Sequence, residues 1–183
     1  MLVSLPTLDA LLQTYAPHLG ADATGYRNHT YRVANFYWRL LPGDAEMLQK
    51  LGIALAFHDL GIWTAGTFDY LPPSRQLARE HLQVIGRPAW QPEVDAMIDH
   101  HHKITATPAG MPASVEAFRR ADWIDVSLGM LRFGVPRAEH LAFFDNAAAQ
   151  VVVRLRLGAD GQGATLLSRI SSLSARRLAL APS

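Results

Sequence analysis

The sequence DAEMLQKLGIALAFHDLG, residues 44–61, contains the helical pattern on which the fold depends. Its apolar stripe consists of Leu48, Leu51, Leu55 and His58. Intervals of three, four and three residues place these side chains on one face of an α-helix. Asp44 is suited to cap that helix, and Gly61 releases the chain after it. The spacing therefore predicts an amphipathic helix over residues 44–58 whose inward face ends in a histidine.

Apolar residues show the same helical spacing in segments on both sides of this one, and Pro and Gly separate the segments. Further helices are expected over residues 4–15, 26–40, 74–84, 92–101 and 112–128, with loops at 16–25 and 61–73. Ser4 and Ser74 are the expected caps of two of them. Residues 137–157 have a helical composition, although VVVRLRL at 151–157 also fits a strand. Residues 158–163 are expected to form a flexible connection and 164–180 an amphipathic helix. The pattern predicts an all-α fold.

Length and composition indicate a single domain over residues 1–183, since a domain commonly has about 150 residues. Hydrophobic residues make up 49% and charged residues 18%. The absence of cysteine excludes disulfide scaffolds, thiolate zinc sites, iron–sulfur clusters and cysteine nucleophiles. A net charge of +1 gives no reason to expect a nucleic-acid polymer or a membrane surface as partner. No apolar run approaches the ~18 residues of a membrane span, and a cytoplasmic location is expected.

Five of the predicted inward faces carry a polar group that is costly to bury. The residues are His29, His58, His81, His101 and Asp122. A single histidine on such a face is usually a packed core residue. Five ionisable groups on separate helices are different, because burying imidazoles and carboxylates together requires a compensating charge. A divalent cation compensates both kinds of group at once.

The adjacent pair His58-Asp59 supports a metal site at a helix end. Neighbouring residues on a helix point about 100° apart, so they normally serve different faces. Both can bind one ion only if the ion lies against the flank between them. The end of a helix before Gly61 suits that arrangement.

Four short motifs together resemble the H…HD…D signature of the HD-domain superfamily of metal-dependent phosphohydrolases. They are NHTYRV at 28–33, HDLG at 58–61, HHHK at 100–103 and RADWID at 120–125. The resemblance covers about residues 22–130 and leaves 131–183 as a C-terminal helical extension. It implies a bundle of about five core helices with extra C-terminal helices.

The resemblance also implies a ligand set. His29, His58, Asp59 and Asp122 would bind one divalent metal ion. A second ion, with Asp59 shared between the two, would use histidines in the interval between Asp59 and Asp122. His101 is the first candidate there, followed by His102. His81 is also included in the expected ligand set, although packing beside Leu77 and Val84 explains it equally well. Nitrogen and oxygen ligands fit Mn²⁺, Fe²⁺, Co²⁺, Ni²⁺ or Zn²⁺, and histidine-rich ligation disfavours Mg²⁺ or Ca²⁺ alone.

Positive side chains near these ligands are candidates to bind phosphate. Arg32 lies three residues after His29 and Arg119 three before Asp122, so each is a helical neighbour of a ligand. His102 and Lys103 follow His101. Each of the cations could equally be a solvated surface residue. The aromatic loop at 61–73 could stack on a base or cover the helices.

The function expected from these features is hydrolysis of a small phosphate ester, plausibly a nucleotide, by metal-activated water. Asp59 would hold the metal, and Lys103 or Asp125 would supply the proton to the leaving oxygen. Asp125 could instead orient a ligand histidine. Two alternatives stay open: a di-iron oxygenase of the same superfamily acting on a small polyol or phosphonate, and a non-catalytic nucleotide sensor. The expected partner is a small phosphorylated molecule, and oligomeric state is not indicated.

Overall fold

All regular secondary structure in the described residues, 1–67 and 69–146, is helical. In this computed structural model the elements follow one another as α1 (Pro6–Leu19), η1 (Gly20–Asp22), α2 (Ala23–Leu40), α3 (Ala45–Phe57), α4 (Gly61–Thr64), α5 (Leu71–Val84), η2 (Pro88–Trp90), α6 (Gln91–His100), α7 (Ala113–Val126) and α8 (Arg137–Asn146). The prediction of an all-α fold is confirmed. The expected segments at 151–157, 158–163 and 164–180 lie outside the described residues.

Helix α3 begins as its sequence predicts. The Asp44 side chain accepts a hydrogen bond from the Met47 backbone N–H at 2.8 Å, which satisfies one of the free donors of the first turn. The second half of α3 is buried, and Ile53, Leu55 and Phe57 are fully enclosed. Burying each of these side chains stabilises the fold by roughly 1.5–3 kcal/mol. Helix α3 is therefore the central element of the core.

Helix α1 differs from the prediction at both ends. It begins at Pro6 rather than after a Ser4 cap, because proline needs no backbone partner in the first turn. It continues through the expected loop to Leu19, which is buried. Gly20 then ends it with a positive φ of 54°, a conformation that glycine adopts readily. The loop predicted at 16–25 is consequently reduced to the single turn η1.

The expected loop at 61–73 also contains more helix than the sequence suggests. Helix α4 forms directly after the His58-Asp59 pair, and α5 begins at Leu71 instead of after Ser74. Ser74 lies inside α5, where it is buried and its Oγ accepts a hydrogen bond from the Gly61 N–H at 2.9 Å. Ser74 therefore joins two helices instead of capping one.

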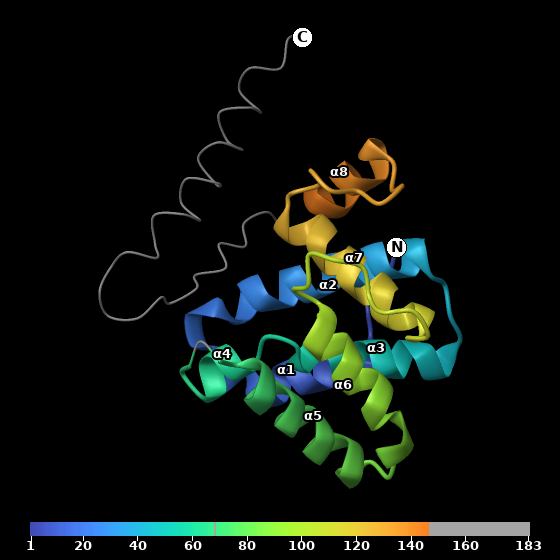
Figure 1. Ribbon diagram of the computed structural model, residues 1–183. Helices are drawn as coiled ribbons and strands as arrows, with labels where there is room; N and C mark the ends of the chain where they lie inside the picture. The colour runs from blue at the N-terminus through green and yellow to red at the C-terminus, as the bar shows by residue number, and fades with distance from the viewer. Residues whose placement is uncertain (68, 147–183) are drawn as a thin grey trace.

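The helices pack so that α3 lies among α1, α2, α5 and α6. Helix α2 runs against α7, and α6 contacts α3, α5 and α7, as the ribbon in Figure 1 shows. Helix α8 contacts α2. The middle of α2, the end of α3, the end of α6 and the last turns of α7 thus meet at one place in the fold.

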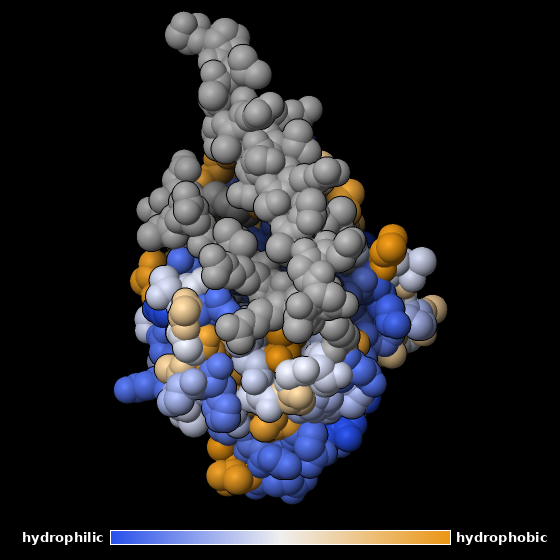
Figure 2. All heavy atoms as spheres, turned by 90° about the vertical axis from the view of Figure 1, so that its left-hand side faces the viewer, coloured by the Kyte–Doolittle hydropathy of each residue, from blue (hydrophilic) through white to orange (hydrophobic). Residues whose placement is uncertain are grey.

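The described surface is mixed in character. On the face shown in Figure 2, hydrophobic residues occur in small groups between hydrophilic ones. None of the described helices is long and apolar enough to cross a lipid bilayer.

Candidate metal centre

Four helices bring the predicted ligands together. His29 lies in the middle of α2, while Asp122 and Asp125 lie one turn apart on α7. The other members follow helix ends: His58 and Asp59 come after α3, and His101 and His102 come after α6. Except for His102, these side chains are all buried. The described part of the chain therefore contains a buried His/Asp cluster that could bind metal.

Two histidines of the cluster are oriented by the last turn of their own helix. The Nδ1 of His58 lies 2.9 Å from the Leu55 carbonyl oxygen, and the Nδ1 of His101 lies 2.6 Å from that of Ile98. A carbonyl oxygen only accepts, so both bonds place a proton on Nδ1. A neutral imidazole has one ring proton, so the Nε2 of each histidine has a free lone pair.

His29 is oriented by a carboxylate instead. Its Nδ1 lies 2.7 Å from Asp125 Oδ2, and Asp125 also accepts two hydrogen bonds from Arg32, at 2.5 and 2.9 Å. Burial opposes ionisation of Asp125, but the hydrogen bonds from His29 and Arg32 lower its pKa. A carboxylate behind a histidine fixes the ring and makes its other nitrogen a better ligand. The structure therefore places Asp125 behind His29, the orienting role that the sequence left open.

Arg32 is buried behind the cluster and is not placed to bind a substrate phosphate. Its side chain is buried and forms the bidentate pair with Asp125. The expectation that Arg32 contacts substrate is thus replaced by a role in holding Asp125 and, through it, His29.

The Asp59 carboxylate lies between two groups of histidines. Its Oδ2 is 3.3 Å from His58 Nε2 and 4.0 Å from His29 Nε2. Its Oδ1 is 3.2 Å from His101 Nε2 and 3.5 Å from His102 Nε2. We call His29, His58 and Asp59 the first triad, and Asp59, His101 and His102 the second triad. Within each triad the ligand atoms lie within 4.8 Å of one another.

The charges at the first triad call for a cation. His29 Nε2 lies 3.0 Å from His58 Nε2 and 3.4 Å from Asp122 Oδ1, while Asp122 Oδ2 is buried without a hydrogen-bond partner. Lone pairs at such distances repel unless a proton or a metal ion lies between them. Burial lowers the pKa of His29, but the hydrogen bond to Asp125 and the charges of Asp125, Asp122 and Asp59 outweigh it and raise the pKa. The donor set and the partnerless Asp122 oxygen fit a bound divalent ion.

The pKa values of the residues in the second triad shift in different directions. Burial lowers the pKa of His101. Burial has the same effect on His102, but the neighbouring Asp59 carboxylate outweighs it and raises the pKa. Burial also opposes ionisation of Asp59, yet the surrounding imidazoles of His58, His101 and His102 lower its pKa well below the ordinary value. Asp59 is therefore ionised at neutral pH, and His102 is half-exposed at the edge of the cluster.

Tyr26 is a supporting residue that the sequence motifs do not single out. Its hydroxyl lies 3.2 and 3.0 Å from the carbonyl oxygens of Leu55 and Ala56, and its ring stacks on His58 with centroids 5.8 Å apart. It thereby holds the end of α3 and the His58 ring. Its position three residues before His29 is the signal that could have indicated this role.

The aromatic loop at 61–73 serves two purposes in the described residues. Trp63 donates from Nε1 to Asp22 Oδ2 at 3.0 Å and packs against Tyr26, so it covers the helices. Tyr70 instead faces the second triad, with its ring centroid 6.1 Å from that of His102. Burial, the charge of Asp59 and an interaction of its hydroxyl with that carboxylate raise the pKa of Tyr70.

Arg119 anchors the loop that follows α6. Its Nη1 donates to the carbonyl oxygens of Lys103 and Ile104 at 3.0 and 3.4 Å, and its Nε and Nη2 bind Glu116 at 2.8 and 2.7 Å. The side chain is buried. These bonds correct the expectation that Arg119 binds phosphate, because its donors already hold the loop that carries His102 and Lys103. Lys103 itself is exposed.

Glu116 makes this anchor sensitive to acid. Hydrogen bonds from Arg119, and further ones from Thr107 and Arg120, lower the pKa of Glu116 to about 2 against the opposing effect of burial. A carboxyl whose folded-state pKa is lowered stabilises the fold above its unfolded pKa and loses this contribution on acidification. We expect Glu116→Gln to cost about 1–3 kcal/mol at pH 7. The cost should diminish as pH falls from 4.5 toward 2.

Urea denaturation of the wild type and of Glu116→Gln across this pH range measures the difference. A difference that stays constant from pH 7 to pH 2 would contradict the assignment.

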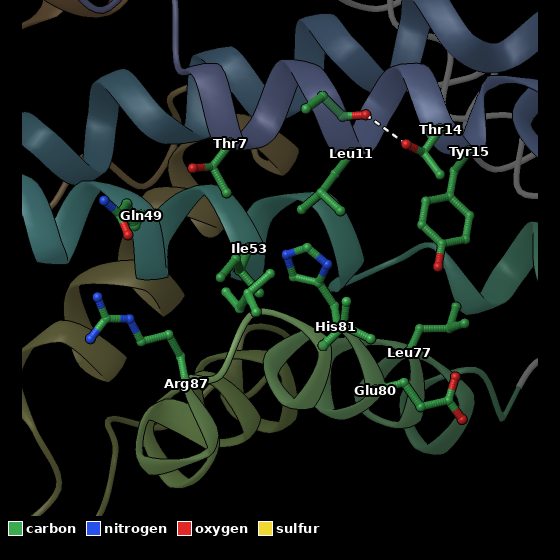
Figure 3. A pocket seen from close by; sticks show the side chains of 13 residues that line it. Thr7, Leu11, Thr14, Tyr15, Gln49, Ile53, Leu77, Glu80, His81 and Arg87 are labelled. Carbon is green, nitrogen blue, oxygen red and sulfur yellow. Dashed lines mark hydrogen bonds between the residues drawn. The ribbon is translucent and has the colours of Figure 1, made fainter.

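His81 does not join the cluster. It lines a separate pocket between α1, α3 and α5, where Leu11, Ile53 and Leu77 also lie (Figure 3). Its ring contacts Phe57 at a centroid distance of 5.8 Å, and burial lowers its pKa. His81 is therefore a residue of this separate pocket and not a neighbour of Asp59. Among the described residues, His102 lies beside Asp59 together with His101.

Comparison with known proteins gives no further assignment. No known family model, curated protein or solved structure matches this chain. The interpretation of the cluster therefore depends on its own geometry and on the motifs that compose it.

Proposed function

We propose that the cluster is a centre for one or two divalent transition-metal ions and that the protein hydrolyses a phosphate ester of a small molecule. The observation that carries the proposal is the convergence of the Nε2 atoms of His29, His58 and His101 on the carboxylate of Asp59. All three histidines have Nδ1 bonded to a fixed acceptor. The resemblance to the HD-domain superfamily supports the same interpretation.

The residues divide between the two triads. His29, His58 and Asp59, with Asp122 beside them, would hold one ion, and Asp59, His101 and His102 would hold the second. Bound ions of this kind neutralise phosphoryl oxygens and lower the pKa of a coordinated water toward 7. Manganese, iron, cobalt, nickel and zinc all accept such nitrogen and oxygen ligands.

The remaining residues support the site without binding a metal ion themselves. Asp125 and Arg32 hold the His29 ring, and Tyr26 holds the end of α3. Lys103 is an exposed cation next to His102, and is the candidate to meet the charge of a phosphate monoester. Nucleotides are plausible substrates within this class.

The direct test is metal analysis of gently purified protein together with a screen of phosphate esters. We expect at least one transition metal ion per chain and phosphate release that a chelator abolishes. Because a ligand that binds only the folded state stabilises it, chelation should also lower the melting temperature by several degrees. Protein without metal, even after incubation with Mn²⁺, would refute the proposal.

The number of ions can be measured separately. Calorimetric titration with Mn²⁺ should show two sites in the wild type and one in the double variant His101→Ala/His102→Ala. His81→Ala is the matched control, since His81 lies in the separate pocket of Figure 3, and it should retain both sites. A single site that both the wild type and the double variant retain would restrict the centre to the first triad.

A di-iron oxygenase is the second candidate, and one observation favours it. Asp59 directs one oxygen to each triad, and together with Asp122 the two triads offer six nitrogen and oxygen ligands: His29, His58, Asp59, His101, His102 and Asp122. Iron bound in preference to manganese, with consumption of O₂ and no phosphate release, would select this alternative. Metal binding without turnover would select the nucleotide sensor.

A further inference from the structure

Tyr70 lies at the solvent side of the second triad. Its ring centroid is 6.5 Å from that of His101 and 6.1 Å from that of His102, the second contact being edge-on. The side chain is partly exposed, whereas Asp59 and His101 behind it are buried. Burial and the charge of the nearby Asp59 carboxylate both raise the pKa of Tyr70. Tyr70 thus stands between the cluster and the solvent.

Gly61, two residues after Asp59, allows the backbone of Tyr70 to pack closely against it. A side chain at Gly61 would collide with the Tyr70 carbonyl oxygen, so only glycine permits this approach. The same carbonyl accepts from the Ser74 N–H at 2.9 Å, while Ser74 Oγ accepts from the Gly61 N–H at 2.9 Å. The glycine of HDLG therefore brings the start of α5, and with it Tyr70, against the cluster.

The two buried groups behind Tyr70, Asp59 and His101, supply lone pairs rather than hydrogens. Asp59 presents a carboxylate, and the Nδ1 proton of His101 is used by the Ile98 carbonyl. A phosphoryl group carries its charge on oxygens that accept hydrogen bonds and are stabilised by fixed donors. A phenol is protonated at neutral pH and can donate one such bond without adding charge.

We propose that Tyr70 is a substrate-binding residue whose hydroxyl donates a hydrogen bond to a phosphoryl oxygen held beside the second triad. The proposal rests on the proposed function of the cluster and names a specific contact within it.

The test compares Tyr70→Phe with Tyr15→Phe. The first variant keeps the ring that contacts the histidines and removes only the oxygen. Tyr15 is the matched control, because it lies on α1 in the separate pocket of Figure 3. Calorimetry measures the affinity of each protein for Mn²⁺ and then, with Mn²⁺ bound, for inorganic phosphate.

We expect Tyr70→Phe to bind Mn²⁺ within about twofold of the wild type and phosphate about tenfold more weakly, the loss of one charge-assisted hydrogen bond. Tyr15→Phe should match the wild type in both. With the ester that the wild type hydrolyses, Tyr70→Phe should lower kcat/KM by about 10- to 100-fold, chiefly through KM.

The possible failures differ from one another. Unchanged phosphate affinity in Tyr70→Phe would overturn the role of Tyr70 and leave the hydrolase proposal intact. If Tyr70→Phe lost as much affinity for Mn²⁺ as for phosphate, the proposal would also be overturned, since the residue would then act on the metal ligands. Wild-type protein that binds Mn²⁺ but no phosphate would refute the hydrolase proposal itself, and the Tyr70 proposal with it.

Discussion

Replacing Asp59 with asparagine is expected to eliminate binding of the second ion, weaken binding of the first, and lower kcat/KM by at least about 1,000-fold. The reason is that one carboxylate serves both triads, with Oδ2 directed at His58 and Oδ1 at His101. An amide of the same size has no charge and offers only one acceptor oxygen. Metal analysis and steady-state kinetics on the same preparation measure both effects.

Asp99→Asn provides a matched control for the Asp59 variant. Asp99 lies on α6 and forms a partly exposed ion pair with Arg75 at 2.6 Å. A surface pair of this kind contributes little, so metal content and activity should stay at wild-type levels. Full metal content in Asp59→Asn would show that the ions, if present, bind elsewhere.

Replacing Lys103 with alanine is expected to leave metal content intact and lower kcat/KM for phosphate esters by roughly 10- to 1,000-fold. A phosphate monoester carries nearly two negative charges at neutral pH, and preorganised positive charge stabilises their redistribution in the transition state. The position of Lys103 is fixed by its backbone, because its carbonyl oxygen accepts from Arg119 Nη1 at 3.0 Å and Trp123 Nε1 at 3.1 Å.

Lys103→Arg distinguishes charge from other effects. The guanidinium retains the charge but has a planar shape, so part of the lost activity should return. Full activity in Lys103→Ala would identify Lys103 as a solvated cation. Another donor would then have to bind the phosphate, and the Tyr70→Phe variant tests one such donor.

The sequence by itself determined the all-α class and the middle of most helices, but not the helical turns at 16–22, 61–64 and 71–73. The intervals from Leu48 to His58, together with Asp44, define α3 because period and capping are local properties. The same locality explains why His58 and His101 direct Nε2 rather than Nδ1 at the cluster, since the Nδ1 of each binds a carbonyl oxygen three residues earlier. Helical spacing identified His29, His58 and Asp122 as candidate ligands, and the adjacent pair His58-Asp59 added Asp59.

The tertiary structure alone decided which of those faces meet. His81 and His101 both lie on apolar stripes, yet the stripe of His81 packs toward α1 and α3 whereas His101 reaches Asp59. Arg32 pairs with Asp125, 93 residues away, so its neighbours on the helix gave no sign that its donors were used. Arg119 has a helical neighbour in Glu116, but its bond to the Lys103 carbonyl, 16 residues away, depends on how α7 packs against the loop after α6. Tyr70 reaches the cluster because Gly61 admits its carbonyl. Helical periodicity orients a side chain about its own axis, but packing between helices distant in the chain decides what that side chain touches.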